Sequence, residues 1–565
     1  MPAAIGFLAI RRSFRDAGFD LGREGAPGYD MAISEGSSGE EANPMAEGFR
    51  ITYATMSADN EELHKLYEEG IETATSWLGQ KHPLYVNGEA RVGSGYKEVR
   101  SPIDSDMLIG EFAQATREDV RDAIAAAKGF ARTWADTPWR ERVRIVRKAA
   151  DLMTERRNEL SALMAMEVGK SRLEALGDVE ESADLLRWNC NEMEKHDGFT
   201  TPMQSLGSAG EYYDVLRPYG VWAVISPFNF PMALAAGPTS GALVAGNCVV
   251  FKPAHLGLFT GLKLYELYMD AGLPKAAFHY LSGPGSVVGD EIVHHPDVGG
   301  ITFTGSYEVG MGIYKGFAAD YPKPIICEMG GKNPTIVSDK ADLDKATDGV
   351  MRSAFGYGGQ KCSANSRVYV HRKVHDEFVR LLREKTEKIK VGNPLEKDVF
   401  LGPIIDESAV ATFEEAAAEA KKNGEVITGG DQITDGDLAR GNYVQPTIVE
   451  VPLDSWIWKK ELFVPFVSIA PYDDLDEAIR LANDTEYGLT AGLYSEDRAE
   501  IDKWLSSIEA GVVYVNRRAG ATTGAWPGVQ PFGGWKGSGT TGKAGGGPYY
   551  VTQYMREQSR TVIQE

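Results

Sequence analysis

The sequence has few residues of the kinds that cross-link a fold or bind a structural metal. It contains only four cysteines in 565 residues, far apart and without a C-x-x-C pair. This pattern argues against a disulfide framework and a zinc site, and it suits a reducing compartment. No run of about 18 apolar residues is present, so no transmembrane helix is predicted. We therefore expect a cytoplasmic protein without a metal.

Positive charge is also scarce. The 59 lysines and arginines are outnumbered by 81 aspartates and glutamates, which gives a formal net charge of -22. A field of this sign repels nucleic acid and anionic membrane surfaces, so we expect neither kind of partner. With 43% hydrophobic and 25% charged residues, the composition is typical of a globular protein that can bury a sizeable core.

The first fifty residues lack the periodicity of the rest of the chain. Residues 34–46 are small, polar and acidic, with no spacing that would order a core face. Residues 1–50 are therefore predicted to be a disordered extension. The early arginines are interleaved with acidic residues, which disfavours a mitochondrial presequence. A start at Met31 or Met45 is an alternative that would leave most of the extension out of the mature protein.

From about residue 58, segments with helical spacing alternate with short strand-like runs. The spacing predicts helices over residues 59–78 and 117–135 and one or two helices over residues 140–166, with Thr116 and Asp119 as a capping signal for the helix at 117–135. Strands are predicted at residues 221–225, 248–251, 300–304 and 335–337. Strands that alternate with helices imply parallel βαβ units in a doubly wound sheet. The predicted fold class is therefore α/β, with ligands at the carboxyl ends of the strands.

Polar residues follow several of the predicted strands. Residues 224–231 (VISPFNFP) leave a strand and place the amide of Asn229 between two aromatic rings. Taken alone, an Asn in such a turn is more often a turn former. Lys252 follows the tip of another strand, within reach of a ribose or phosphate. In residues 303–310 (FTGSYEVG), Gly305 permits close backbone approach, and the N-terminus of the next helix can receive a pyrophosphate.

Two further segments carry groups suited to covalent chemistry. Glu328 comes just before a glycine pair, and Cys362 follows another pair in residues 357–367 (YGGQKCSANSR). A lone cysteine is usually an inert core residue. Cys362, however, lies in a polar stretch, whereas the other three cysteines have apolar or helical neighbours. Cys362 is therefore the one cysteine predicted to be reactive.

In order and spacing, these motifs resemble the signatures of the aldehyde dehydrogenase superfamily, from about residue 60 to the end of the chain. Residues 353–370 and 528–542 are most similar to the branch that oxidises glutamate γ-semialdehyde, the pyrroline-5-carboxylate dehydrogenases. The resemblance implies a doubly wound parallel-sheet cofactor domain, an α/β catalytic domain and an oligomerisation arm.

The resemblance also implies domain boundaries. A cofactor domain is expected over residues 51–327, interrupted near residues 200–218 by an arm that pairs with another subunit. A catalytic domain follows over residues 328–515. Residues 516–565 would carry the substrate-anchor loop, return to the cofactor domain and end in an oligomerisation segment. Strand formers at residues 212–216 would leave an open edge unless a partner covers it, so we expect a homo-oligomer, a dimer or larger.

The resemblance assigns Cys362 as the nucleophile, Glu328 as the base that activates water, and Asn229 as a donor to the oxyanion. Thiolate addition gives a tetrahedral thiohemiacetal, and hydride transfer leaves a thioester that water hydrolyses. The expected reaction is oxidation of L-glutamate γ-semialdehyde to L-glutamate with reduction of NAD(P), in proline catabolism. One alternative is an NAD(P)-dependent dehydrogenase of another semialdehyde or an aliphatic aldehyde. The other is a non-catalytic protein on this fold, which would not need all three residues.

The resemblance further implies the cofactor site, with Lys252 at the adenosine ribose and Gly305 and Ser306 at the pyrophosphate. Glu461 and Phe463 would bind the nicotinamide ribose and ring. NAD is therefore the expected cofactor.

Two positions depart from the family pattern. His255 replaces the acidic residue that usually binds the ribose 2′-hydroxyl, and an imidazole does not repel a 2′-phosphate, which leaves NADP open. Val464 replaces the glycine that usually follows Phe463, a change beside the expected ring site.

Substrate binding is implied by the same branch. Donors to the α-carboxylate and aromatic rings beside the tether are expected at Ser363, Gly524, Ala525, Phe230 and Phe532. The loop over residues 517–527 is longer than the family's usual form, which displaces its backbone N–H groups from the expected position.

Overall fold

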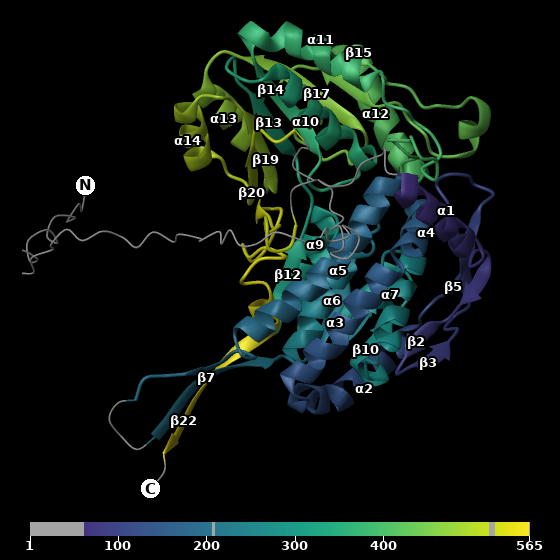
Figure 1. The fold of residues 1–565 in the computed structure, drawn as a ribbon, viewed down its shortest axis with the longest axis vertical. Coiled ribbons are helices and arrows are strands. Elements are labelled where there is room, and N and C mark those ends of the chain that lie inside the picture. Colours follow the sequence, from purple (N-terminus) through teal and green to yellow (C-terminus); the bar gives the residue numbers. More distant parts are fainter. Residues whose placement is uncertain (1–60, 206–209, 519–525, 564–565) are drawn as a thin grey trace, which may run out of the picture. The chain divides into compact units, whose positions relative to one another are not determined.

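The computed structural model describes residues 61–205, 210–518 and 526–563. The extension predicted over residues 1–50 lies outside this range. From residue 51 onward the chain forms one unit built around two seven-stranded sheets (Figure 1).

The first sheet has the order β12-β11-β8-β9-β10-β2-β3. Its central strands β8 (Val221–Ile225), β9 (Cys248–Lys252), β10 (Phe278–Tyr280), β11 (Gly300–Thr304) and β12 (Ile325–Glu328) are parallel. The chain passes from β8 to β9 and β10, then resumes with β11 on the other side of β8. Ligands of such sheets bind at this switch point, outside the carboxyl ends of the strands.

The antiparallel pair β2 (Leu84–Val86) and β3 (Glu89–Arg91) extends the first sheet beyond β10. A separate three-stranded sheet has the order β1-β5-β4, formed by β1 (Gln80–His82), β4 (Tyr96–Arg100) and β5 (Leu108–Ala113).

The second sheet has the order β15-β16-β17-β14-β13-β19-β20 and is parallel except for β15 at its edge. Its strands are β13 (Asn333–Val337), β14 (Asn365–His371), β15 (Glu425–Thr428), β16 (Thr447–Glu450), β17 (Phe466–Tyr472), β19 (Thr490–Tyr494) and β20 (Val512–Val515). A short pair, β18 (Tyr487–Gly488) and β21 (Trp535–Lys536), lies outside it. The predicted α/β fold with doubly wound parallel sheets is confirmed.

Helices cover both sheets. They are α1 (Glu61–Thr75), α2 (Arg117–Asp136), α3 (Trp139–Glu155), α4 (Arg157–Val168), α5 (Arg172–Lys195), α6 (Ala233–Ala245), α7 (Leu258–Asp270), α8 (Asp290–His294), α9 (Tyr307–Phe317), α10 (Leu343–Phe355), α11 (His375–Thr386), α12 (Glu407–Asn423), α13 (Leu475–Asn483) and α14 (Arg498–Ser507). The capping box predicted for α2 is present, with Thr116 accepting from the Asp119 N–H and Asp119 accepting from the Thr116 N–H.

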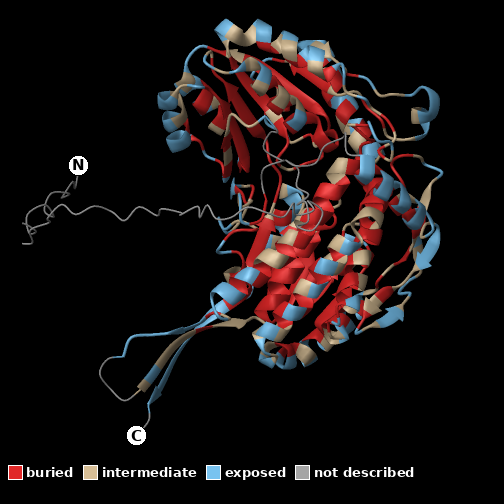
Figure 2. Cartoon of the chain, viewed as in Figure 1, coloured by how far each residue is buried: buried red, intermediate tan, exposed pale blue. Residues whose placement is uncertain are grey.

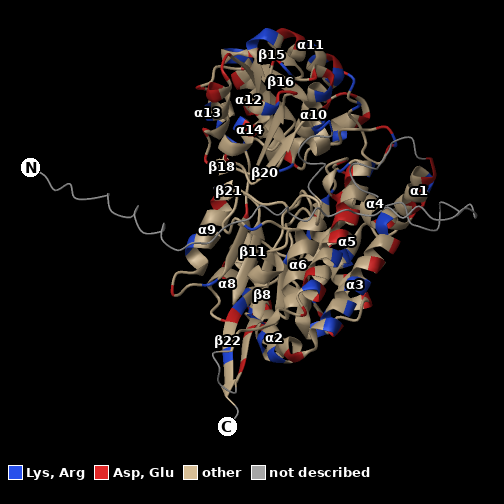
Figure 3. Ribbon diagram, turned by 60° about the vertical axis from the view of Figure 1, so that its left-hand side comes forward, with Lys and Arg blue, Asp and Glu red and all other residues tan. Residues whose placement is uncertain are grey.

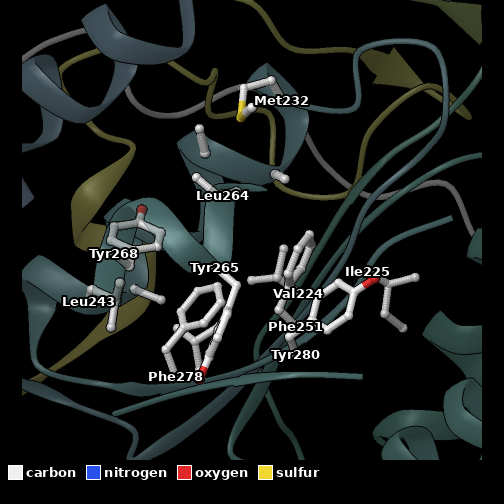
Figure 4. Close-up of a cluster of buried hydrophobic side chains, with 14 of the residues drawn as sticks. Val224, Ile225, Met232, Leu243, Phe251, Leu264, Tyr265, Tyr268, Phe278 and Tyr280 are labelled. Carbon is white, nitrogen blue, oxygen red and sulfur yellow. The ribbon is translucent and has the colours of Figure 1, made fainter. Parts of the chain in front are cut away.

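The strands of the first sheet are buried on both faces, as expected for parallel strands between helices (Figure 2). Every residue of β8 and β9 is buried. Val224 and Phe251 pack with Tyr265 of α7 and with Phe278 and Tyr280 of β10 (Figure 4). This continuous apolar core holds the strand ends, and with them the functional residues, in fixed positions.

An arm of three strands runs away from both sheets (Figure 1). It comprises β6 (Thr200–Pro202), β7 (Gly210–Pro218) and β22 (Met555–Ile563), in the order β22-β7-β6. Residues 213–215 of β7 are therefore paired on both sides within the chain, and the outer edges of this sheet belong to β22 and β6. Every residue of β22 after Met555 is exposed.

Charged side chains lie mainly on the outer helices, with both signs interspersed (Figure 3). Within the described residues, no helix combines the length and apolar character needed to cross a membrane. The same part of the chain contains no group of three or more His, Cys, Asp or Glu side chains placed to hold a metal ion.

Candidate active site

A cavity of about 920 Å³ lies at the carboxyl ends of β8, β9 and β11, where the strand order of the first sheet reverses. It brings together most of the predicted catalytic and cofactor residues, namely Asn229, Lys252, His255, Gly305, Ser306, Cys362, Glu461 and Phe463. These residues come from both sheets and from the connections after their strands.

A second, narrower cavity of about 80 Å³ meets the first at the nucleophile. Cys362 lines both cavities, whereas Glu328 lines only the narrow one. The narrow cavity is otherwise mainly apolar, with the rings of Trp526 and Phe532 among its walls. A group bound in the large cavity and a second group in the narrow one would therefore meet at the Cys362 sulfur.

Backbone geometry places Cys362 at this junction. Tyr357, Gly358 and Gly359 have φ values of 51°, 62° and 66°, so the chain turns through the left-handed region just before the nucleophile. A Cβ on Gly359 would collide with the carbonyl oxygen of Val464. Glycine is thus required there both for its conformation and for its lack of a side chain.

The Asn333 side chain holds the turn that carries Cys362 through two hydrogen bonds. Its Nδ2 donates to the carbonyl oxygens of Cys362 at 2.7 Å and of Ala364 at 2.9 Å. Asn333 is the first residue of β13, so the second sheet itself fixes the position of Cys362.

The glycine pair after Glu328 allows close approach of other groups. A Cβ on Gly331 would collide with the Cys362 carbonyl oxygen, and one on Gly330 with the Glu461 carboxylate. Glu461 also accepts the Gly331 N–H at 2.7 Å. The two glycines therefore allow the Cys362 turn and the Glu461 side chain to pack closely against the segment that follows Glu328.

Burial favours the protonated form of both the Glu328 carboxyl and the Cys362 thiol. It raises the pKa of Glu328 from its usual range to about 8. The pKa of the Cys362 thiol is raised well above its ordinary value, first by burial and then by the nearby carboxylates of Glu461 and Glu328. The Glu328 Oε2 atom is buried without a hydrogen-bond partner among the described residues, and Glu328 lines the narrow cavity.

Asn229 is 3% exposed and lies in the turn after β8. Its Nδ2 donates to the Gln360 carbonyl at 3.0 Å, two residues before the nucleophile. The side-chain amide is thus fixed beside the Cys362 turn, in the lining of the same cavity.

The large cavity offers the groups that a dinucleotide requires. Lys252 ends β9 with its ammonium buried, and this burial lowers its pKa to about 8 because no carboxylate pairs with it among the described residues. Ser306 is the N-cap of α9, directly after Gly305, so the helix N-terminus opens on the cavity. A buried, unpaired cation and a helix N-terminus in one cavity fit the ribose and pyrophosphate of NAD(P).

A side cavity of about 460 Å³ adjoins the Lys252 end of the large one. Lys97, Lys252 and His255 line it together with Asp406. Burial lowers the pKa of His255, and the charges of Lys97 and Lys252 lower it further.

Val464, which replaces the glycine usual in the family, does not line the large cavity where the nicotinamide ring is expected. Val464 is 4% exposed and packs in the core of the second sheet. The preceding Phe463 has φ 59° and lines the large cavity, where its ring meets that of Phe228 edge-on at 5.9 Å between centroids. The valine side chain therefore points away from the cavity that Phe463 lines.

The predicted substrate residues are only partly brought together. Phe532 lines the narrow cavity with Cys362. Ser363 is buried and Phe230 half-buried, and neither lines the two cavities. The Lys170 ammonium lies 3.5 Å from the centroid of the Phe230 ring. Gly524 and Ala525 lie outside the described residues.

Three residues that contribute to the site were not singled out from the sequence. Asn333 lies five residues after Glu328, but its bonds to the Cys362 turn depend on the pairing of β13 with β14. Glu181 of α5 and Trp526 line the narrow cavity. They lie far from Cys362 in the sequence, and no local pattern distinguishes them from a surface Glu or a core Trp.

Comparison with known proteins agrees with this geometry. The chain is 38% identical over 510 residues to 1-pyrroline-5-carboxylate dehydrogenase of Bacillus cytotoxicus, covering 89% of this chain and 97% of that protein. The 1-pyrroline-5-carboxylate dehydrogenase from Thermus with bound NAD matches with a TM-score of 0.85 at 32% identity, covering 90% of this chain and 97% of that one.

Proline utilization A of Bdellovibrio bacteriovorus matches with a TM-score of 0.83 at 36% identity. The match covers 88% of this chain and 51% of the other, so this chain spans about half the length of that protein. The family model described as "Aldehyde dehydrogenase family" matches residues 91–560. By sequence and by fold, the chain belongs to the aldehyde dehydrogenase family.

Proposed function

We propose that this aldehyde dehydrogenase oxidises L-glutamate γ-semialdehyde to L-glutamate in proline catabolism, with NAD(P) as hydride acceptor. The observation that carries the proposal is the placement of Cys362 at the junction of two cavities, with Glu328 lining the narrow one alone. The names of the relatives, 1-pyrroline-5-carboxylate dehydrogenases, support the choice of substrate.

In this reaction Cys362 adds to the aldehyde carbon from the narrow cavity. Because its pKa is raised, the thiol must transfer its proton to water in the cavity as the C–S bond forms, which leaves the former aldehyde oxygen as an alkoxide. The Asn229 amide and the Cys362 backbone N–H donate to the alkoxide of the thiohemiacetal, a type of contact worth about 10²–10³ in rate. Bound NAD(P) supplies the acceptor for the hydride that leaves the same carbon.

The resulting thioester is hydrolysed by water. Glu328 takes a proton from that water, which attacks the thioester carbonyl and releases the acid and the Cys362 thiol. Glu328 lines the narrow cavity, where the acyl group on Cys362 is proposed to lie. A water molecule beside Glu328 can therefore reach the acyl carbon. An enzyme that transferred the acyl group to phosphate or to another thiol, instead of to water, would need no such base.

Recognition of the amino acid end is assigned to four groups. Ser363, which follows Cys362 in the sequence but lines neither cavity in this structure, and the N–H groups of Gly524 and Ala525 are proposed from the resemblance to hold the α-carboxylate. Glu181 adds a carboxylate to the lining of the narrow cavity, the charge that an α-ammonium group requires.

The substrate assignment is tested with Ser363→Ala. Loss of a hydrogen bond to a charged group costs about 1.5–3 kcal/mol, or roughly a 10- to 150-fold loss in kcat/KM for the semialdehyde. Propanal has no carboxylate, so its kcat/KM should change less than about threefold. Equal losses for both would assign Ser363 to the nucleophile turn and favour an enzyme for aliphatic aldehydes.

For the cofactor, we propose that NAD binds in the large cavity and that NADP is also accepted. His255 replaces a carboxylate that would repel a 2′-phosphate, and Lys97 and Lys252 add positive charge to the adjoining side cavity. Steady-state kcat/KM values for NAD and NADP, measured with one aldehyde, test this preference. An enzyme that does not turn over with NADP would contradict it.

We further propose a homo-oligomer assembled through the arm, and a cytoplasmic location. The long exposed strand β22 carries Val562 and Ile563, which are 50% and 55% exposed. Such an edge is a template for pairing with a second chain. The four cysteines are all unpaired, as suits a reducing compartment.

A further inference from the structure

One face of α5 packs against the C-terminal segment beside the narrow cavity. Glu181, Asp184, Leu185 and Trp188 follow the spacing that places residues on one side of a helix. Glu181 and Leu185 line the narrow cavity. The indole N–H of Trp188 donates to the Gly547 carbonyl at 3.2 Å. This helix face therefore supports the wall of the cavity that faces Cys362.

Trp526 forms part of that wall. It is 6% exposed and lines the narrow cavity together with Cys362 and Phe532. Its Nε1 donates to Oδ2 of Asp184 at 2.7 Å. A bond from a neutral donor to a carboxylate is about twice as strong as one between neutral groups, so it fixes the plane of the indole ring.

Asp184 is itself held in place. Its other oxygen, Oδ1, accepts from Nη1 of Arg187 at 3.3 Å, and Arg187 also bonds Asp151 at 3.1 Å and Thr154 at 3.0 Å. The carboxylate that binds Trp526 is therefore oriented by a neighbour on its own helix and, through that neighbour, by α3.

The backbone of Trp526 is fixed from the opposite side. Its carbonyl accepts the N–H groups of Val529 at 2.9 Å and of Gln530 at 3.0 Å. The Gln530 side chain donates to the Val513 carbonyl in β20 at 2.9 Å and accepts from Arg517 at 2.9 Å. Both the backbone and the ring of Trp526 are thus anchored, one to the second sheet and the other to α5.

We propose that Trp526, oriented by Asp184, determines which aldehydes reach Cys362 by limiting the size of the narrow cavity. Trp526 is the bulkiest of the side chains that line this cavity of about 80 Å³. A ring held at both the backbone and the indole N–H cannot rotate aside to admit a longer chain. Trp526 is a specificity-determining residue, and Asp184 is a positioning residue that acts through it. The inference rests on the proposed function only in taking the narrow cavity as the aldehyde site.

The test is a chain-length series of propanal, hexanal and octanal with Trp526→Val and Trp526→Phe. One methylene in a hydrophobic pocket changes kcat/KM by about 10- to 200-fold. Trp526→Val should therefore raise the hexanal-to-propanal ratio of kcat/KM by at least about tenfold. Because each ratio is taken within one enzyme, it cancels general damage to catalysis. An unchanged ratio in an active Trp526→Val enzyme overturns the proposal.

The role of Asp184 is tested in a double-mutant cycle with Trp526→Phe, which keeps an aromatic ring but removes the indole N–H. Asp184→Ala should raise the hexanal-to-propanal ratio about threefold in the wild-type background and leave it unchanged in the Trp526→Phe background. Equal shifts in both backgrounds would show that Asp184 does not act through Trp526. This cycle also keeps the proposal testable if Trp526→Val fails to fold.

Trp535→Val is the matched control. Trp535 lies in the same segment, is 50% exposed and lines neither cavity, so its replacement should leave the ratio unchanged. The wild-type preference for glutamate γ-semialdehyde over propanal is measured separately. Its absence would contradict the proposed substrate without affecting the chain-length result.

Discussion

At the scale of single residues, replacement of Cys362 and replacement of Glu328 should stop the reaction at different steps. Cys362→Ala should abolish dehydrogenation, because no thiohemiacetal can form. Glu328→Gln keeps the nucleophile, so it should release about one equivalent of reduced cofactor per active site and then stall as a thioester. Rapid-mixing absorbance at the wavelength of the reduced cofactor distinguishes the two. Full steady-state turnover by Glu328→Gln, without a burst, would assign the base elsewhere.

The pKa of Glu328 sets the pH dependence of thioester hydrolysis. Burial raises this pKa to about 8, so the carboxyl is mostly protonated at neutral pH. A base acts only when ionised, and hydrolysis should therefore accelerate as pH rises towards 8 and level off above it. Below the pKa the rate should fall about tenfold per pH unit. The measurement is the decay of the acyl-enzyme after the burst, between pH 6 and 9.

A rate of hydrolysis that is constant from pH 6 to 8 would contradict this account of Glu328. The burst itself depends on loss of the Cys362 proton, so its own pH dependence must be recorded separately from the decay. The two profiles then report the nucleophile and the base independently.

Candidate site residues can be predicted from the sequence where the residues next to them in the chain indicate their role. Cys362 was distinguished by its polar neighbours, and the large cavity contains it with Asn229. Glu181 and Trp526 could not be found in this way, because their place in the site arises only where α5 meets the C-terminal segment. The predicted place of Phe230 beside the substrate likewise depends on a side-chain direction that the sequence does not give, and the Lys170 ammonium lies 3.5 Å from the centroid of its ring.

At the scale of elements, the α2 capping box offers a test of local stability. Thr116→Ala removes the acceptor for the Asp119 N–H, which typically costs about 0.5–2 kcal/mol. In a chain of this size we expect the melting temperature to fall by about 0.5–2 °C while kcat is retained. Differential scanning calorimetry at one scan rate measures the shift.

Thr116→Ser keeps a hydroxyl at the cap and serves as the control. Its melting temperature should fall by less than about a third of the loss seen with Thr116→Ala, since Ser and Thr are similar N-cap residues. Equal losses for the two variants would mean that the threonine methyl group, and not the cap, stabilises this end of α2.

Predicted elements matched the structure where the hydrophobic pattern had clear ends. The strands at residues 221–225 and 300–304 have the predicted bounds. The helical region at residues 140–166 is divided at Arg156, which has the non-helical angles φ -97° and ψ 16°. The hydrophobic pattern leaves open whether residues 140–166 form one helix or two, because no glycine or proline lies at this break.

At the scale of the whole molecule, the domain boundary predicted between residues 327 and 328 falls within β12 (Ile325–Glu328), one residue before that strand ends. The next strand, β13, belongs to the other sheet. Glu328, the proposed base, therefore ends a strand of the first sheet, while Cys362, the proposed nucleophile, lies between α10 and β14 of the second. Catalysis thus requires the two sheets to keep their relative position, and the glycine pair at residues 330 and 331 permits the close approach described above.

The arm provides the last prediction, which concerns assembly. If β22 pairs with a second subunit, Val562 and Ile563 are covered there, and burial of such side chains is worth about 1.5–3 kcal/mol each. Because a two-fold interface repeats every contact, the double substitution Val562→Glu with Ile563→Glu should weaken association by at least about 100-fold. Sedimentation velocity at several concentrations should show a dimer or larger for the wild type and a shift towards monomer for the variant.

Leu453→Glu, at a 42% exposed position distant in sequence from the arm, is the control and should sediment like the wild type. A wild-type chain that sediments as a monodisperse monomer would contradict the proposed oligomer, and an unchanged variant would place the interface on another surface.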